Sequence, residues 1–153
     1  MFHIRLANPG ERAAVEAVVE SAYAPYVPRL GRKPGPMLED YGALIAGRDV
    51  HVLLDEGRIV GILVLIPEKH EMLLDNVAVL PESQGRGYGR ALIAFAEDAA
   101  RARGLHAIRL YTNEAMTENI AFYRRLGFVE THRAEEKGFR RVYMAKPLVA
   151  PRP

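Results

Sequence analysis

Apolar residues along the chain alternate with polar ones or form short runs rich in β-branched residues, as in β-strands. Seven segments have this character, and they cover residues 2–7, 50–55, 58–67, 71–80, 106–112, 128–132 and 140–144. The turn-like pair Glu56-Gly57 joins the second and third of them. These two segments are therefore expected to form an antiparallel hairpin.

Helical spacing of apolar residues predicts four helices, over residues 10–22, 37–46, 86–103 and 117–126. Gly104 and Gly127 follow the last two helices and are natural stops. Residues 23–36 contain four prolines and two glycines, so we expect neither a regular helix nor a strand there. The interleaved order of strands and helices predicts an α/β fold, with a mixed sheet covered by helices on both faces.

The length of 153 residues fits one domain, predicted over residues 1–147, followed by a short flexible tail over 148–153. The absence of cysteine excludes disulfides, thiolate metal sites and a catalytic thiol. The five histidines are scattered, so no metal site is predicted. The first residues lack the plan of a signal peptide, and the longest apolar stretch, residues 59–66, is far short of a membrane span. We therefore expect a cytoplasmic protein without membrane contact.

The formal net charge of +2 comes from basic residues spread along the chain, which does not by itself indicate nucleic acid. Binding of nucleic acid through Arg29–Lys33 is a weak alternative, and it predicts an affinity that falls steeply with salt. We expect no nucleic-acid partner.

Residues 84–89 form a glycine-rich turn, Gln-Gly-Arg-Gly-Tyr-Gly, between a predicted strand and a predicted helix. Three residues without β-carbons let backbone N–H groups converge on an anion, and the helix N-terminus adds partial positive charge. Arg86 and Arg90 add full charges. The turn therefore predicts a phosphate or pyrophosphate cradle. The alternative is a tight connection whose glycines serve packing alone.

The spacing G-x-G-x-G differs from the dinucleotide fingerprint, and no G-K-[ST] of a nucleoside-triphosphate loop is present. The turn also follows a predicted antiparallel meander rather than the first strand of a Rossmann unit. Both nucleotide interpretations are therefore disfavoured.

These residues resemble the GNAT superfamily of acyl-CoA-dependent N-acetyltransferases. The family signature [Q/R]-x-x-G-x-[G/A] matches residues 84–89, and its preceding strand matches Asn76–Pro81. A second family block matches Asn119–Phe128, in the expected order, and the element order fits from residue 2 to 147. The resemblance implies a GNAT-type fold, with a mostly antiparallel sheet that contains one splayed parallel strand pair.

The resemblance implies that acetyl-CoA is the cosubstrate and lies between the splayed strands. Its pantetheine arm would hydrogen-bond the strand backbone at Val77 and Val79, as strand addition does, and the glycine-rich turn would hold its pyrophosphate. Asn113, at the carboxyl end of a predicted strand, either contacts a ligand or caps the following turn. The expected cofactor-binding residues are Val77, Ala78, Val79, Gln84, Gly85, Arg86, Gly87, Tyr88, Gly89, Arg90, Asn113 and Asn119.

Acetyl transfer to an amine needs a neutral amine, a stabilised oxyanion and a protonated leaving thiol. Tyr123 matches the usual general acid of the family, although a half-buried tyrosine bonded elsewhere is the alternative. Asp75 is the predicted general base, with Glu71 as a second candidate, and an exposed Asp75 without catalytic role is the alternative. Tyr111 occupies another common family position for the base. The oxyanion is assigned to the N–H of Val77.

In this family, the segment matching residues 23–36 usually covers the acceptor site. We therefore expect Tyr23, Tyr26 and Arg29 to contact the acceptor, a small-molecule or peptide amine, with a solvated loop as the alternative. The function predicted is an acetyl-CoA-dependent N-acetyltransferase, an acyltransferase that works by direct attack in a ternary complex. A non-catalytic acyl-CoA-binding or sensing module on the same fold is the alternative. A homodimer through the closing strands is also compatible with the family.

Overall fold

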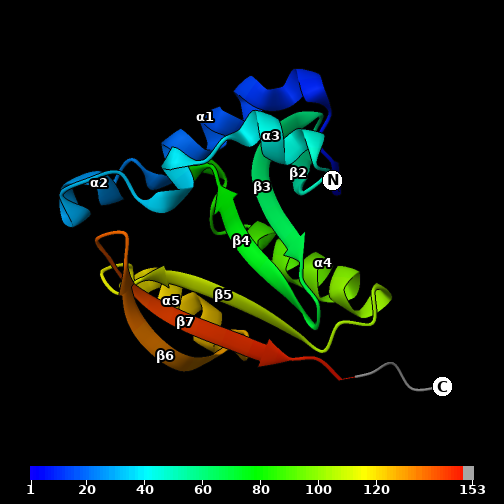
Figure 1. Cartoon of the computed structure of the whole chain (residues 1–153). Helices are drawn as coiled ribbons and strands as arrows, with labels where there is room; N and C mark the ends of the chain where they lie inside the picture. The colour runs from blue at the N-terminus through cyan, green and yellow to red at the C-terminus, as the bar shows by residue number, and fades with distance from the viewer. Residues whose placement is uncertain (150–153) are drawn as a thin grey trace.

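The computed structural model describes residues 1–149, in which seven strands form one sheet in the order β1-β2-β3-β4-β5-β7-β6 (Figure 1). Neighbouring strands are antiparallel except for β4 and β5, which are parallel. The mixed sheet confirms the predicted fold class. The strands are β1 (Phe2–Leu6), β2 (Val50–Asp55), β3 (Arg58–Pro67), β4 (Glu71–Val79), β5 (Ala107–Asn113), β6 (Val129–Glu136) and β7 (Phe139–Pro147).

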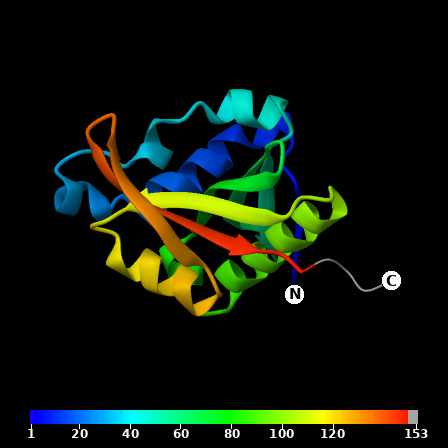
Figure 2. The same cartoon turned by 60° about the horizontal axis from the view of Figure 1, so that its bottom comes forward.

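Helices cover both faces of the sheet (Figure 2). Helices α1 and α4 both pack on β3 and β4, and every residue from Val60 to Leu65 of β3 is buried, as in a strand covered on two sides. No helix within residues 1–149 is both long and apolar enough to cross a membrane. The helices are α1 (Arg12–Tyr23), α2 (Tyr26–Leu30), α3 (Tyr41–Ala46), α4 (Tyr88–Ala102) and α5 (Thr117–Arg125), with single 3₁₀ turns η1 (Pro9–Glu11), η2 (Gly35–Leu38) and η3 (Pro81–Ser83).

The parallel strands β4 and β5 pair at one end only. Pairing joins Glu71–Leu73 to Ala107–Arg109, and beyond these residues the two strands separate. The predicted splayed pair is therefore confirmed. A register shift in β4 lies at the start of the separation: Val64 pairs with Asn76 and Leu65 with Leu74, which leaves Asp75 as the extra residue of a β-bulge.

The proline-rich segment differs from the prediction, because Tyr26–Leu30 form a short helix. Pro28 is tolerated within it since the first turn of a helix has no acceptors for its N–H groups. Gly31, with φ +74°, ends the helix. The next helix begins at Tyr41, later than predicted, because the Asp40 side chain caps it by accepting from Ala43 N at 3.0 Å.

The closing hairpin β6–β7 is longer than predicted. Strand β6 is the edge of the sheet and is almost entirely exposed, so its residues lack the alternation that marks a half-buried strand. Strand β7 ends at Pro147, where the predicted domain ends. Of the predicted tail, residues 150–153 lie outside the described residues.

Candidate active site

Two neighbouring cavities meet where β4 and β5 separate. The first has a volume of about 280 Å³, and we call it the carboxylate cavity because Glu39 and Asp75 line it. The second has a volume of about 620 Å³ and is lined by the turn before α4, so we call it the glycine-loop cavity. Ligands in the two cavities can therefore approach each other at the side chains that line both, which are Tyr23, Val77, Asn119 and Tyr123.

The backbone of β4 presents unpaired polar groups to this junction. Leu80 N donates to Val60 O at 2.8 Å, and bonded pairs alternate along an antiparallel ladder. Val77 and Val79 therefore direct their N–H and C=O groups away from β3 and toward the gap left by β5. The Val77 carbonyl accepts from the Tyr23 hydroxyl (3.3 Å) and the Val79 carbonyl from Gln84 Nε2 (3.2 Å), whereas both N–H groups face the opening.

The glycine-rich turn exposes a run of backbone donors. The first backbone bond of α4 runs from Ala91 N to Gly87 O, so the N–H groups before Ala91 have no helical acceptor. Gly85 and Gly87 have φ of +82° and +83°, and a β-carbon on either would touch nothing within 4 Å. These two glycines are needed for backbone conformation rather than for space. Gly89 differs, because its β-carbon would lie 3.3 Å from Phe122 of α5.

Basic side chains line the glycine-loop cavity, although they are not the pair that the sequence indicates. Arg90 lines it as predicted, and Arg125, at the end of α5, joins it. The Arg86 guanidinium instead lies 3.6 Å from the carboxylate of Asp55, outside both cavities. Tyr88 also bonds Asp55 through its hydroxyl, at 2.6 Å. Arg125 lies within the second family block, Asn119–Phe128, but nothing in the motif itself assigns it a ligand.

These features fit the chemistry of acetyl-CoA. Converging N–H donors, a helix N-terminus and two arginines suit a pyrophosphate. Outward-facing N–H groups on a strand without a neighbour suit an extended amide-containing arm, which would bind as an added strand does. Ala78 and Val79 line the same cavity, so the predicted strand residues and the glycine turn are brought together.

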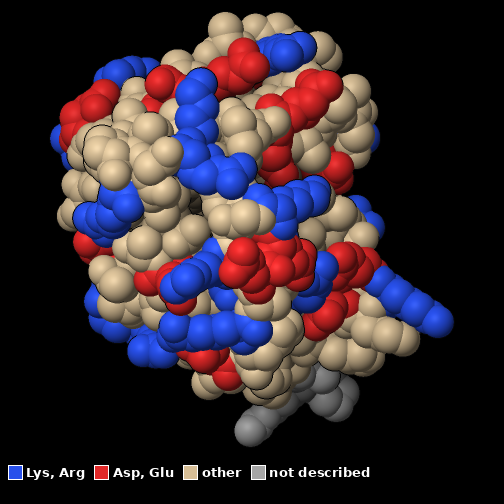
Figure 3. All heavy atoms as spheres, turned by 60° about the vertical axis from the view of Figure 1, so that its left-hand side comes forward, with Lys and Arg blue, Asp and Glu red and all other residues tan. Residues whose placement is uncertain are grey.

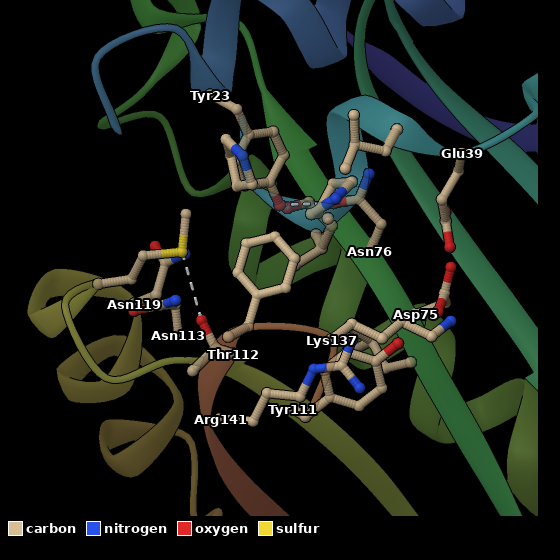
Figure 4. Close-up of a pocket in the computed structure, with 18 of the residues that line it drawn as sticks. Tyr23, Glu39, Asp75, Asn76, Tyr111, Thr112, Asn113, Asn119, Lys137 and Arg141 are labelled. Atoms are coloured by element: carbon tan, nitrogen blue, oxygen red, sulfur yellow. Dashed lines mark hydrogen bonds between the residues drawn. The ribbon is translucent and has the colours of Figure 1, made fainter. Parts of the chain in front are cut away.

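The carboxylate cavity contains two carboxyl groups that face each other (Figure 4). Glu39 follows η2 in the loop above the sheet, and Asp75 is the bulged residue of β4. Glu39 Oε2 and Asp75 Oδ2 are buried and have no hydrogen-bond partner among residues 1–149. Burial, and then the neighbouring Asp75, raises the pKa of the Glu39 carboxyl well above its usual range. Glu39 is therefore protonated at neutral pH.

A chain of hydrogen bonds holds the loop above β4. The Tyr23 hydroxyl donates to Asn76 Oδ1 (2.5 Å), and Asn76 Nδ2 donates to the Tyr41 hydroxyl (3.0 Å), which in turn donates to the carbonyl of Pro36. Asn76 is almost fully buried, and this network satisfies its amide. Tyr23 is predicted to contact the acceptor. It lines both cavities, and its hydroxyl is already bonded to Asn76.

Tyr123 lies at the junction of the two cavities. Its ring packs edge-on against Phe122 and Phe128, with centroids 5.4 and 5.7 Å away. Burial raises the pKa of its phenol, so the hydroxyl stays protonated at neutral pH. Asn119, one helical turn earlier on α5, lines the same junction, as the shared helix face predicts.

The β6–β7 hairpin forms a wall of the carboxylate cavity that sequence analysis missed. Lys137, Phe139 and Arg141 line the cavity, and the Arg141 guanidinium lies 4.2 Å above the ring of Tyr111. Arg32 stacks on Phe139 at 4.0 Å and so connects the hairpin to the loop above the sheet. The only sequence signal for this wall is the turn-forming Lys137-Gly138, which gives no indication of where the hairpin lies.

The remaining predicted residues have different surroundings. Asn113 accepts from Ala115 N at 2.9 Å, as a turn cap does, and lines the carboxylate cavity rather than the cofactor side. Tyr26 lines the glycine-loop cavity. Arg29 lines neither cavity and pairs with Glu118 at 2.8 Å. Glu71, the second candidate base, lies in the paired part of β4, 3.7 Å from Arg109 and outside both cavities.

Charges of both signs are interspersed on the face that Figure 3 brings forward. Basic side chains there lie beside acidic ones (Figure 3). Arg140–Glu114 and Arg29–Glu118 are exposed ion pairs among the described residues. This face therefore lacks the continuous basic surface that nucleic acid favours.

A model of the acetyltransferase (GNAT) family matches residues 15–128. The chain belongs to this family. The mycothiol acetyltransferase of Streptomyces griseus is 30% identical over 143 residues, which cover 86% of this chain and 44% of that protein. That of Arthrobacter sp. (strain FB24) is 46% identical over 52 residues, which cover 34% of this chain and 16% of that protein. The chain thus spans less than half the length of these curated relatives.

Solved structures of GNAT proteins share the whole fold. The ribosomal-protein-S18-alanine N-acetyltransferase of Escherichia coli superposes with a TM-score of 0.77 at 22% identity, covering 99% of this chain and 96% of that one. The PaiA N-acetyltransferase of Thermoplasma acidophilum, in complex with coenzyme A, gives a TM-score of 0.79 at 16% identity, covering 96% and 99%. These matches confirm the predicted GNAT fold.

Proposed function

We propose that the chain transfers an acetyl group from acetyl-CoA to a primary amine by direct attack in a ternary complex. The observation that carries this proposal is the meeting of the two cavities at Tyr123. One cavity has free backbone donors and arginines for an anionic cofactor, and the other has a carboxyl pair for an amine. A cytoplasmic location and a homodimer stay predictions.

The glycine-loop cavity would hold acetyl-CoA through the N–H groups of Gly85 to Arg90, with Arg90 and Arg125 as counter-charges. The N–H group of Val79 would bind its amide-containing arm. When bound, acetyl-CoA supplies an acyl group already activated as a thioester. The N–H of Val77 also faces the junction, where it can donate to negative charge that develops on an acyl oxygen.

The carboxyl pair suits removal of a proton from the acceptor. An alkylamine has a pKa of about 10 in water and is mostly charged at neutral pH. Asp75 is the base we propose, since it lies on the splayed strand and lines the cavity next to the junction. Glu39, whose raised pKa keeps it protonated at neutral pH, faces Asp75 across the cavity (Figure 4).

Tyr123 is the group proposed to donate to the departing sulfur. Its hydroxyl stays protonated because burial raises its pKa, and its ring is fixed by Phe122 and Phe128. A hydroxyl held at the junction serves a leaving thiol without reorganisation of the site. The same features count against a purely sensing module, which needs neither a proton donor nor a carboxyl pair.

Isothermal titration with acetyl-CoA, and separately with NADH and ATP, tests the cofactor assignment. We expect micromolar binding of acetyl-CoA alone, followed by thiol release when an amine is added. Failure of acetyl-CoA to bind would overturn the proposal. Tight binding without thiol release over a broad set of amines would favour the sensing module instead.

A further inference from the structure

The carboxylate cavity carries opposite charges on two walls (Figure 4). Glu39 and Asp75 come from the loop above the sheet and from β4, whereas Lys137 and Arg141 come from the β6–β7 hairpin. The Glu39 carboxyl keeps its proton at neutral pH, so the acidic wall has less negative charge than two carboxylates would give. The hairpin contributes two cationic side chains, one of which, Arg141, also pairs with Glu136. A bare amine or a polyamine would offer no anion to Lys137 or to the remaining donors of Arg141.

Lys137 occupies a backbone conformation that disfavours lysine. Lys137 and Gly138 form the two-residue turn of the hairpin, with φ of +53° and +81°. Such turns favour Asn, Asp and Gly, because a side chain with a β-carbon is strained at positive φ. The Glu56-Gly57 turn of the β2–β3 hairpin has the same pair of positive φ angles, so this conformation does not itself mark a site. Lys137 differs from Glu56 because it lines the cavity, where its charge can meet a ligand.

Arg141 is held in place before any ligand binds. Its guanidinium stacks 4.2 Å above the Tyr111 ring and donates to Glu136 at 2.9 Å, and only 14% of its side chain is exposed. A guanidinium has five N–H donors, so the bond to Glu136 leaves others for a ligand. A fixed fork of donors suits a carboxylate or phosphonate in particular, since such an anion accepts two parallel bonds.

The size of the cavity limits the ligand. A volume of about 280 Å³ is at the small end for ligand sites. Phe139 and Met116 supply apolar lining between the charged walls. The space is therefore suited to a compact molecule with two charged ends rather than to a folded partner.

We propose that the acceptor is a small amine that carries its own anionic group, with the size and charges of an amino acid. This proposal rests on the acetyltransferase function above. The amine would lie beside Asp75, where its proton is removed, and the anionic group would pair with Lys137 and Arg141. Asp75 takes one proton from the ammonium group. The amine nitrogen then attacks the acetyl carbon, and the amide bond forms as the carbon–sulfur bond breaks. Coenzyme A leaves as a thiol with a proton from Tyr123, and the second amine proton returns to Tyr123.

The test compares matched acceptors in a thiol-release assay, after titration has shown that acetyl-CoA binds. Leucine and phenylalanine are compared with their amides, with the corresponding decarboxylated amines, with putrescine and with a tripeptide that begins with leucine. We expect kcat/KM to be at least about tenfold higher for the two amino acids than for any other acceptor, as a charged hydrogen bond to the carboxylate predicts.

Variants of Lys137 separate a binding role from a structural one. Lys137→Asn removes the charge and fits positive φ, so it should fold at least as well as the natural chain while raising KM for the amino acids about tenfold. The decarboxylated amines should lose clearly less, so the preference for each amino acid over its decarboxylated amine should fall. Lys137→Glu should shift the preference toward putrescine. Lys69→Asn, on the exposed turn between β3 and β4, is the matched control and should change neither series.

The outcomes distinguish the two proposals. If acetyl-CoA does not bind, the acetyltransferase function itself is overturned. If acetyl-CoA binds but the decarboxylated amines, putrescine or the tripeptide react fastest, the acceptor class proposed here is wrong and the transfer function stands. An equal loss of rate for both series in Lys137→Asn would also overturn it, because a charge contact affects mainly the acceptor that bears the anion.

Discussion

The side-chain carboxyl groups of Glu39 and Asp75 face each other in the carboxylate cavity, each with a buried oxygen that has no other partner among residues 1–149 (Figure 4). Burial, with Asp75 beside it, raises the pKa of the Glu39 carboxyl, so Glu39 keeps a proton at neutral pH. The bulge in β4 leaves Asp75 without a partner residue on β3, and η2 delivers Glu39 from the loop above. The pair therefore depends on both the bulge in β4 and the η2 turn.

This pair should make the protein less stable as the pH rises. The pKa of Glu39 is raised in the folded state above its ordinary value of 4.5, mainly by burial. The raised pKa is about 9, so unfolding releases a proton at any pH between 4.5 and about 9. The free energy of unfolding therefore falls as the pH rises, by up to about 1.4 kcal/mol per pH unit. Glu39→Gln keeps a neutral, hydrogen-bonding side chain and removes this dependence.

Thermal unfolding at pH 5 and pH 8 measures the effect. We expect Glu39→Gln to be more stable than the natural chain at pH 8, with a clearly smaller difference at pH 5. Glu135→Gln, on the exposed face of β6, is the control and should show no such dependence. A gain in stability that is the same at both pH values would contradict the raised pKa of Glu39.

The glycine turn could be predicted from the sequence, because it depends on a local motif, whereas the splayed strands are expected only from the resemblance to the GNAT family. The turn Gln84–Gly89 needs only its own glycines to adopt its shape. Glu39 could not be predicted as part of the site. Its position depends on a 3₁₀ turn after Pro36 and on a single-residue bulge at Asp75, and neither gives a periodic signal in the sequence.

The wall of the carboxylate cavity that the β6–β7 hairpin forms could not be predicted either, for a different reason. Strand β6 is exposed on nearly every residue, so its polar sequence does not show where the strand ends or that Lys137 reaches a cavity. Arg86 is the opposite case. Its motif predicts contact with a bound anion, but its side chain instead pairs with Asp55 of β2, a strand distant in the sequence. Tertiary partners of long side chains are not encoded in the spacing of a motif.

Gly87→Ala should weaken both stability and cofactor binding. A side chain at φ +83° is strained, which costs about 1–2 kcal/mol, and relief of the strain would turn the donors of the loop away from the cavity. We expect a lower unfolding temperature and a higher Kd for acetyl-CoA. Gly10→Ala is the control, because Gly10 has no positive φ and a β-carbon there meets nothing. Equal effects in the two variants would contradict this account of the loop.

Arg125 should contribute to binding of the anionic part of the cofactor only. Arg125→Gln removes a positive charge from the lining of the glycine-loop cavity and should raise the Kd of acetyl-CoA about tenfold. S-acetylpantetheine, which lacks the pyrophosphate and the nucleotide, should bind both proteins equally. Arg103→Gln, at the far end of α4, is the control. Equal weakening of both ligands would show that Arg125 supports the fold of the site rather than the phosphates.

Tyr123→Phe tests the proton donor at the junction. The substitution keeps the ring and therefore its edge-on packing with Phe122 and Phe128, and it removes only the hydroxyl. A general acid contributes roughly 100-fold or more to a rate, so we expect kcat to fall by about that factor while the Kd of acetyl-CoA changes little. Tyr143→Phe, whose hydroxyl bonds Glu136 outside both cavities, is the control. If Tyr123→Phe keeps its kcat, the leaving thiol takes its proton from another group. Asp75, once it has taken a proton from the amine, is then the next group to test.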